Sequence, residues 1–284
     1  MAAAALAAAG LIIAGPSLSA AQSGSPAWAT FQGNMGRSGV ANVTGTTVNS
    51  EANAFGGIPI GAMEGSAAIS ATDTAYVGDD DGYVYAFSPS SPAAALWKFK
   101  ADGPVIGTPS LTSDNSKLFV GSMNGTVYAI NASTGAKIWS QTLGGSVAAS
   151  PVIGSDGTIY VPNTNGTVFA LAGTDGKVIW QQAITGAIDG SLALSPDGHT
   201  LYAAGTAGYM YGINTADGKL GTAFYLTSSA LGSPSVDANG NIYVTTSTGD
   251  LMSFSPGSGT ARWIFPTNAH AASHSTPAVS NSLA

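Results

Sequence analysis

Short runs of apolar residues, alternating with polar ones and separated by turns, recur along most of the chain. In one unit the four runs are residues 109–112, 117–121, 126–130 and 137–142. The second and third of these runs are joined by Asn124-Gly125, a pair that is typical of β-hairpin turns. No segment after residue 21 shows a sustained helical period. The pattern therefore predicts four short antiparallel strands in each unit.

Three kinds of residue recur with a nearly constant period of about 42 residues. A small residue, often followed by Pro, opens each unit: Ser66, Thr108, Ser150, Ser191, Ser233 and Thr276. A glycine stands at the same turn of every unit: Gly82, Gly125, Gly166, Gly208 and Gly249. A tryptophan stands on the outer strand of all units except the fourth: Trp97, Trp139, Trp180 and Trp263. Four antiparallel strands per unit of this length predict an all-β protein, a β-propeller of four-stranded blades.

The glycines and the tryptophans suit different structural roles. Glycine adopts the positive φ that tight turns need, so we expect these glycines at hairpin turns. We expect the tryptophans to fill the space between neighbouring blades, because aromatic side chains bury a large apolar area. Phe55 precedes Ser66 by 11 residues, the same separation as between Trp97 and Thr108. We therefore expect Phe55 to pack between blades as well.

The number of units suggests an incomplete ring. Five units are complete, from Ser66 to about Ser275, and a sixth begins at Thr276. Residues 52–64 look like a lone fourth strand. We expect five complete blades plus partial strands of a sixth, in one propeller domain over residues 52–284, and we interpret the chain as truncated at its C-terminus. The alternative is an open ring whose free sheet edges are completed by a partner or by oligomerisation.

The first 21 residues resemble a secretory signal peptide. Residues 2–14 are almost entirely apolar, and Gly15-Pro16 and a run of small residues ending at Ala21 follow. The apolar run is too short to span a bilayer, so we expect no transmembrane helix. No Lys or Arg precedes it, which leaves an Ala-rich tail as the alternative. We expect residues 22–51 to form a lead-in to the propeller, and the protein to be secreted, periplasmic or on the cell surface.

The consensus of the units reads roughly Y-V-G-[ST]-x-[DN]-G-x-V-Y-A, followed by a turn with Gly and then Trp. It resembles the repeat of PQQ-like (pyrroloquinoline quinone) β-propellers, found in quinoprotein dehydrogenases and in the outer-membrane protein assembly machinery. Residues 28–34, WATFQGN, with Arg37 and Gly39, are similar to the segment that precedes the first blade in such proteins. The resemblance covers about residues 28–284 and specifies a fold rather than a function.

Composition excludes several classes of function. Only 8% of the residues are charged, and the 8 basic residues against 15 acidic ones give a net charge of −7, which argues against nucleic-acid binding. The absence of cysteine excludes disulfides, thiolate metal sites and lipid attachment through Cys. The resemblance makes this absence notable, because familiar assembly propellers are lipoproteins and many quinoprotein dehydrogenases stack the quinone on a disulfide of adjacent cysteines.

Few residues are candidates for chemistry, and we predict no catalytic or cofactor-binding residue. Asp79, Asp80 and Asp81 are a weak candidate for Ca²⁺, but the sequence Asp81-Gly82 is typical of a turn and no EF-hand glutamate follows. His270 and His274 have H-x-x-x-H spacing without the helix or glutamate of a zinc site, and we interpret both, with His199, as loop residues. No G-x-S-x-G or phosphate-binding motif occurs.

The sequence leaves three functions open. The first is an exported, non-catalytic scaffold that binds a protein or a polysaccharide, with no cofactor. The second, implied by the resemblance, is a fragment of a quinoprotein dehydrogenase that holds PQQ with Ca²⁺ at the axis beside a carboxylate base. The third is an extracellular sensor or surface module. Sequons for glycosylation occur at Asn42, Asn124, Asn131 and Asn165.

Overall fold

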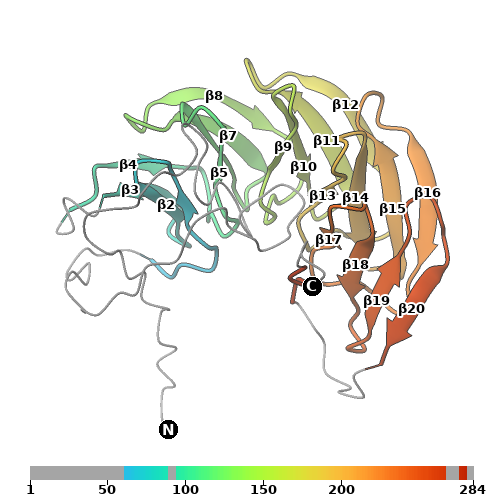
Figure 1. Cartoon of the computed structure of the whole chain (residues 1–284). Helices are drawn as coiled ribbons and strands as arrows, with labels where there is room; N and C mark the ends of the chain where they lie inside the picture. The colour runs from blue at the N-terminus through green and yellow to red at the C-terminus, as the bar shows by residue number, and fades with distance from the viewer. Residues whose placement is uncertain (1–60, 89–93, 267–274, 280–284) are drawn as a thin grey trace, which may run out of the picture.

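The protein is built of five four-stranded antiparallel sheets that follow one another along an arc (Figure 1). The computed structural model describes residues 61–88, 94–266 and 275–279. Across these residues it contains strands β1 to β20 and no helix. The expectation of an all-β propeller with five complete blades is confirmed.

Each blade is a meander in which strands pair in chain order. Blade 1 contains β1 (Ala68–Ile69), β2 (Ala75–Gly78), β3 (Tyr83–Phe87) and β4 (Trp97–Lys100). Blade 2 contains β5 (Ser110–Leu111), β6 (Lys117–Gly121), β7 (Thr126–Asn131) and β8 (Lys137–Thr142). Blade 3 contains β9 (Val152–Ile153), β10 (Thr158–Pro162), β11 (Thr167–Ala172) and β12 (Val178–Ala183). Blade 4 contains β13 (Ala193–Leu194), β14 (Thr200–Gly205), β15 (Tyr209–Asn214) and β16 (Leu220–Tyr225). Blade 5 contains β17 (Ser235–Val236), β18 (Ile242–Thr245), β19 (Leu251–Phe254) and β20 (Ala261–Phe265).

The apolar core lies between the blades rather than within one of them. Side chains alternate along each strand, so every sheet presents one face to the preceding blade and the other to the following blade. Val84 and Ala86 of β3 pack with Leu118 and Tyr128 of blade 2 in one buried cluster. Similar clusters join blades 2 and 3, 3 and 4, and 4 and 5. Each boundary between blades is therefore a small hydrophobic core of its own.

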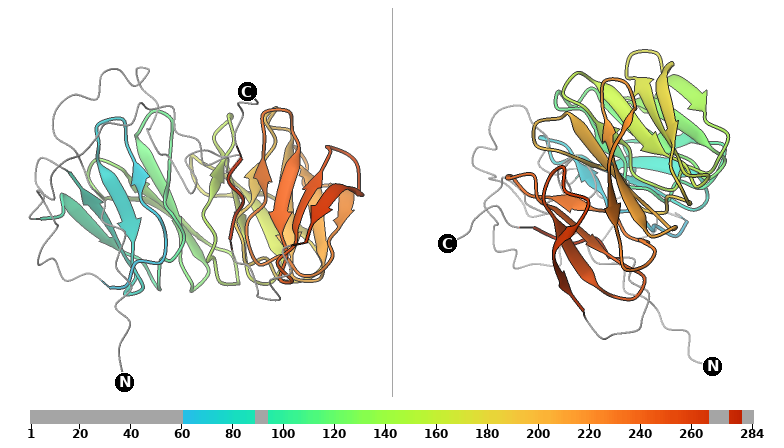
Figure 2. Two further views of the ribbon diagram at one scale, coloured as in Figure 1. Left: turned by 60° about the horizontal axis from the view of Figure 1, so that its bottom comes forward. Right: turned by 90° about the vertical axis from the view of Figure 1, so that its right-hand side faces the viewer.

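A ladder of hydroxyl groups joins the inner strands of neighbouring blades. These strands lie on the inside of the arc in Figure 1, and the blades stand side by side in the left view of Figure 2. The backbone N–H before each inner strand donates to the side-chain oxygen of the equivalent Ser or Thr in the next blade. The bonds join Ser66 to Thr108 (3.0 Å), Thr108 to Ser150 (3.0 Å), Ser150 to Ser191 (2.9 Å), Ser191 to Ser233 (2.8 Å) and Ser233 to Thr276 (3.3 Å). The residues that open each unit of the sequence are thus the rungs of this hydroxyl ladder.

Residues 275–279 lie against blade 5 as an inner strand lies against the blade before it. Ser110 Oγ of blade 2 donates to the carbonyl of Pro151 at the start of blade 3, and Ser235 Oγ of blade 5 donates in the same way to the carbonyl of Pro277. The carbonyl of Ser275 also accepts a bond from Thr245 Oγ1 (2.6 Å). The segment is not assigned as a strand, but it lies at the inner position of a sixth blade.

Other expectations fall outside the part of the chain that the structure describes. These are the signal-like residues 1–21, the lead-in 22–51, and Phe55 in the expected lone strand. Among the described ranges, no helix is long and apolar enough to cross a membrane.

Candidate functional site

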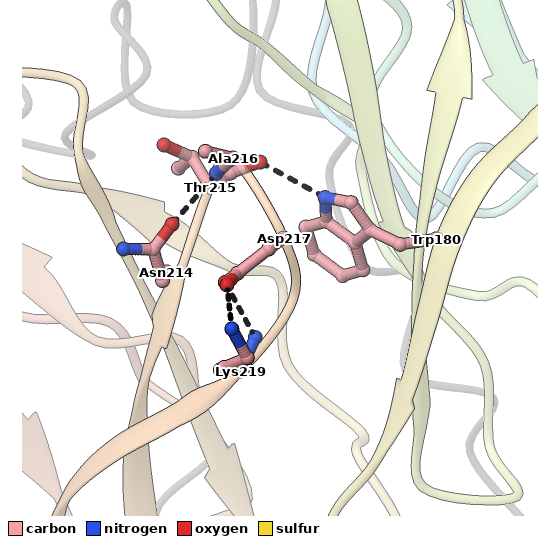
Figure 3. Close-up of polar contacts among 6 residues, drawn as sticks. All are labelled: Trp180, Asn214, Thr215, Ala216, Asp217 and Lys219. Atoms are coloured by element: carbon pink, nitrogen blue, oxygen red, sulfur yellow. Dashed lines mark hydrogen bonds and ion pairs between the residues drawn. The ribbon is translucent and has the colours of Figure 1, made fainter.

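Three outer-strand tryptophans hold the blade that follows them through the same contact. Each indole N–H donates to a backbone carbonyl near the turn between the third and fourth strands of the next blade. The bonds join Trp97 to Ala132 (3.0 Å), Trp139 to Gly173 (3.2 Å) and Trp180 to Thr215 (2.9 Å; Figure 3). The polar end of each tryptophan is therefore satisfied while its rings cover apolar surface.

A glycine in each of these turns allows the indole to approach the backbone. Gly176 has a φ of +77°, and a Cβ atom there would lie 2.6 Å from Cε3 of Trp139. Gly135 and Gly218 are in the same position under Trp97 and Trp180. Both the left-handed conformation and the close approach exclude other side chains.

Polar side chains fix the shape of the turn that receives Trp180 (Figure 3). The N–H of Ala216 donates to Oδ1 of Asn214 (2.8 Å), and the N–H of Lys219 donates to Oδ1 of Asp217 (3.1 Å). The ion pair between Lys219 and Asp217 is exposed, and pairs of this kind contribute little to stability. The bonds from backbone N–H groups to Asn214 and Asp217 therefore shape the turn more than the ion pair does.

A second contact across the boundary comes from the residue two positions after the tryptophan. Phe99, in the sequence W-K-F, packs edge-on against Tyr128 of blade 2, with ring centroids 5.2 Å apart. In blade 4, where Thr222 replaces the tryptophan, Phe224 packs in the same manner against Phe254 of blade 5 at 5.4 Å. The outer strand therefore reaches the next blade through two positions, and the second supplies an aromatic ring in blades 1 and 4.

In blade 5 both of these positions are exposed. Strand β20 carries W-I-F at 263–265, which repeats the W-K-F of blade 1. Trp263 is 42% exposed and Phe265 is 62% exposed, whereas Trp139 is 8% exposed. Leu251, Trp263, Ile264 and Phe265 line an apolar groove of about 440 Å³. We call Leu251, Trp263 and Phe265 the blade-5 face. Ile264 is paired with the buried Met252, and its side chain points to the other side of the sheet.

A cavity of about 350 Å³ opens at the axis, lined by the connections that lead into the inner strands of the blades. Its wall consists mainly of Gly, Ala, Ser and Thr, including the rungs of the hydroxyl ladder. Glu64 and Asp189 are the ionisable residues among the described lining residues. The cavity is therefore small, polar and negatively charged.

The three aspartates of the weak metal candidate have separate positions. Asp79 is buried, and its carboxylate accepts bonds from the N–H groups of Tyr83 (2.7 Å) and Gly61 (3.0 Å). Asp80 and Asp81 are exposed in the same turn. Burial, together with the negative charge of Asp79, raises the pKa of Tyr85 to about 12. No group of three or more His, Cys, Asp or Glu side chains within the described ranges could hold a metal ion.

The remaining candidates lie in turns. The five recurring glycines have φ values between +78° and +89° at the hairpins between second and third strands. His199 is exposed and its N–H donates to Oδ1 of Asp197 (3.0 Å). Of the sequon asparagines, Asn124 and Asn165 use their side-chain amides to bond the carbonyls of Asp102 and Gly144. Asn131 accepts bonds from the N–H groups that follow it, and His270, His274 and Asn42 lie outside the described residues.

Sequence reasoning included Trp263 but missed its partners in the blade-5 face. Phe265 and Leu251 were not singled out, because exposed apolar residues on a strand look the same in sequence as buried ones. The signal that could have found Phe265 is the shared W-x-F of blades 1 and 5. The two carboxylates of the axial cavity carry no sequence signal at all.

Comparison with known proteins finds matches to one family and to many solved structures. Residues 17–187, 80–220 and 164–283 match the family described as outer membrane protein assembly factor BamB. The crystal structure of BamB from Moraxella catarrhalis has a TM-score of 0.61 and 20% identity over 72% of this chain and 65% of that one. The quinohemoprotein alcohol dehydrogenase from Comamonas testosteroni has a TM-score of 0.67 and 12% identity over 84% of this chain and 49% of that one.

These structures share the fold of the chain. The chain spans less than two thirds of the first structure and about half of the second. No curated protein matches it.

Proposed function

The chain belongs to the PQQ-like propeller family described as outer membrane protein assembly factor BamB, and from this premise we propose that it is an extracytoplasmic scaffold that binds a protein partner and carries out no catalysis. The expected resemblance to PQQ-like propellers is thereby confirmed. The proposed location is supported by the family description, which names an assembly factor of outer membrane proteins.

The blade-5 face is the observation that carries the proposal. Phe265 and Trp263 expose 62% and 42% of their surfaces on the same side of β20, next to the half-buried Leu251. Contiguous apolar surface of this kind is characteristic of sites that bind proteins. Aromatic residues are also enriched in protein–protein interfaces, where their rigid rings bury area at low entropic cost. The face therefore supports a protein partner.

The low charge of the chain bears on the source of the binding affinity and on how the affinity depends on salt. With 8% charged residues, little electrostatic attraction is available to steer a partner to this face. Burial of apolar area is then the main source of affinity. We expect the dissociation constant to change little between low and moderate salt concentrations.

Site-specific photo-crosslinking in the source organism tests the proposal. A photoreactive phenylalanine analogue replaces Phe265 in one variant and Tyr225 in the control, because Tyr225 is 65% exposed on the outer strand of the neighbouring blade. We expect a discrete protein adduct from position 265, absent from position 225 and lost when Trp263→Ala is added. Equal labelling at both positions, or none at position 265, would refute a partner at this face.

The quinoprotein alternative depends on the axial cavity. Quinone chemistry there would be that of PQQ with Ca²⁺, which oxidises a substrate after a base removes a proton. PQQ carries several carboxylates, whereas the described lining offers Glu64 and Asp189 and no Lys or Arg. The described lining therefore offers no counter-charge for the carboxylates of the quinone, and the bound Ca²⁺ would have to supply it. We expect that PQQ with Ca²⁺ leaves the melting temperature of the protein unchanged, and a clear upward shift would revive this alternative.

A further inference from the structure

We propose that β12, the outer strand of blade 3, pairs edge to edge with β12 of a second copy of this chain, so that two copies form a dimer around a two-fold axis. The inference goes beyond the proposed function, because it concerns another surface and another partner. Strand β12 lies on the outer side of the arc, in the middle of the described fold (Figure 1). Blades 2 and 4 on either side of it are both complete four-stranded sheets.

The outer side of β12 carries backbone groups that face away from its own sheet. Across the described ranges, β12 pairs with β11 and with no other strand. The N–H of Ile184, directly after β12, donates to the carbonyl of Gly166 on the β11 side (2.8 Å). Backbone groups of successive residues point to opposite sides of a strand, so Gln182 also faces β11, whereas Gln181 and Ala183 face outward. Such an edge is a template for pairing with another strand.

The outer strands of the other blades have features that hinder edge pairing. Proteins protect exposed edges with charged side chains, above all with Lys. Two lysines lie on β4, Lys137 lies on β8 and Arg262 lies on β20. Strand β16 has no charge, but its Tyr225 N–H donates to the carbonyl of Gly259 in blade 5 (3.2 Å). Of the five described outer strands, only β12, with the sequence VIWQQA, has neither a charged residue nor a backbone bond to the next blade.

The residues along this edge suit a second copy of the same strand. A two-fold axis brings identical surfaces together, so an uncharged edge is favoured, because like charges directly opposite each other destabilise a sheet. An axis at Gln181 pairs this residue with itself through its outward N–H and carbonyl, and the two side-chain amides can bond each other. The same register places Ala183 of one copy beside Ile179 of the other. Ile179 is 55% exposed and gains an apolar neighbour in the dimer.

Cysteine crosslinking tests the inference, because the chain has no Cys of its own. In a hydrogen-bonded antiparallel pair the facing Cα atoms lie about 5.5 Å apart, within the range that a disulfide spans. We expect Gln181→Cys to give a disulfide-linked dimer under mild oxidation. The matched control is Ser140→Cys, because Ser140 is the equivalent exposed residue on β8, directly after Trp139. We expect this control to remain monomeric on a non-reducing gel.

Analytical ultracentrifugation of the cysteine-free chain measures the same pairing. We expect a monomer–dimer equilibrium whose dissociation constant rises about tenfold or more in Gln181→Lys, because the two lysines would face each other at the axis. Ser140→Lys places the same charge on β8 and should leave the dissociation constant unchanged. The melting temperatures of both variants establish that they are folded.

Three results would overturn the inference. They are a parent chain that stays monomeric at every concentration, equal crosslinking of Gln181→Cys and Ser140→Cys, and an unchanged dissociation constant in Gln181→Lys. Self-association that W263A/F265A abolishes and Gln181→Lys does not would assign the contact to the blade-5 face instead. The photo-crosslink at position 265 tests the proposed function separately, because it reports on a partner at a different surface.

Discussion

At the scale of single residues, the position under each indole requires glycine for two reasons: its backbone has a positive φ, and the indole packs directly against it. Replacing Gly176 by Ala adds a Cβ atom 2.6 Å from Trp139 and keeps a φ of +77°. We expect a loss of about 2–4 kcal/mol, from backbone strain and overpacking together. Urea denaturation measures it.

Gly144 provides the matched control for this substitution. Its φ of +75° is nearly the same, but no atom lies within 4 Å of the position of its Cβ. Gly144→Ala should therefore cost only the backbone term, about 1–2 kcal/mol. In a Trp139→Ala background the two glycine substitutions should cost the same, since the steric term is gone. A Gly176 effect that persists without the indole would contradict the proposed contact.

Asp237 should make the stability of the protein depend on pH. Burial acts to raise its pKa, but bonds from Asn241, Tyr243 and Asn239 outweigh burial, and the pKa is lowered. The unfolded chain then binds more protons than the folded one as pH falls. The stabilisation is complete above the unfolded pKa of about 3.9 and is lost as pH drops through the folded value.

The variant Asp237→Asn tests this dependence. We expect it to be less stable than the parent by about 1–3 kcal/mol at neutral pH, with the gap closing at acidic pH. Unfolding free energies across the acidic range measure the gap, and the exposed Asp80→Asn serves as control. A gap of constant size would show that the carboxylate charge is not responsible.

The sequence locates the key residues of the blades better than it explains them. A constant period is enough to find Trp97 and Trp139, because repeated geometry demands a repeated side chain. The acceptor carbonyls lie 34 to 35 residues further on, and no side-chain pattern marks a carbonyl. Asp79 shows the same limit, since its bond to the N–H of Gly61 depends on how two distant backbone segments meet.

At the scale of elements, the hydrogen bonds of the hydroxyl ladder link each blade to the next. Ser233→Ala removes the acceptor of the Ser191 N–H at a site that is buried. A buried donor without a partner costs about 1–3 kcal/mol. We therefore expect this loss in thermal or urea unfolding of Ser233→Ala.

Ser233→Thr is the matched control, because Thr108 and Thr276 occupy the same rung in other blades. It should keep the hydroxyl bond and stay close to the parent in stability. Equal losses from Ala and Thr would assign the effect to packing instead of the hydrogen bond.

Strand boundaries were predictable where alternation and turns are strong. The expected second and fourth strands of blade 2, 117–121 and 137–142, coincide with β6 and β8. The inner strand expected at 109–112 is only Ser110–Leu111. Before it, the N–H of Thr108 donates to Ser150 of the adjoining blade, and after it, Thr112 closes the turn with its N–H bonded to the carbonyl of Lys117. Pairing within a blade is thus readable from sequence, whereas pairing between blades is not.

At the scale of the whole molecule, stability should be distributed unevenly along the arc. A repeat protein is held together by interfaces between neighbours, and the blade-5 face contributes no buried interface at Phe265. We expect amides of β20 to exchange with deuterium about tenfold faster than those of β8 and β12. Exchange measured by mass spectrometry tests this, and equal protection in all three strands would contradict it.

The number of blades followed directly from the sequence period, but the surfaces did not. The axial cavity is lined by the small residues that open each unit, which were identified, and by Glu64 and Asp189, which were not. These carboxylates come from connections of variable sequence, so no repeat marks them. Likewise, whether an aromatic pair is covered depends on its neighbour in space and not on its own strand.

The direction of the tryptophan contacts has a consequence for the order in which the protein folds during its synthesis. The indole N–H groups of Trp97, Trp139 and Trp180 each donate to a carbonyl 34 to 35 residues later in the chain. During synthesis, the apolar side of a blade that contacts the next blade therefore stays exposed until most of the next repeat has left the ribosome. If the blades fold in chain order, each new blade covers the apolar side of the blade before it. The nascent chain then exposes the apolar side of its newest blade alone.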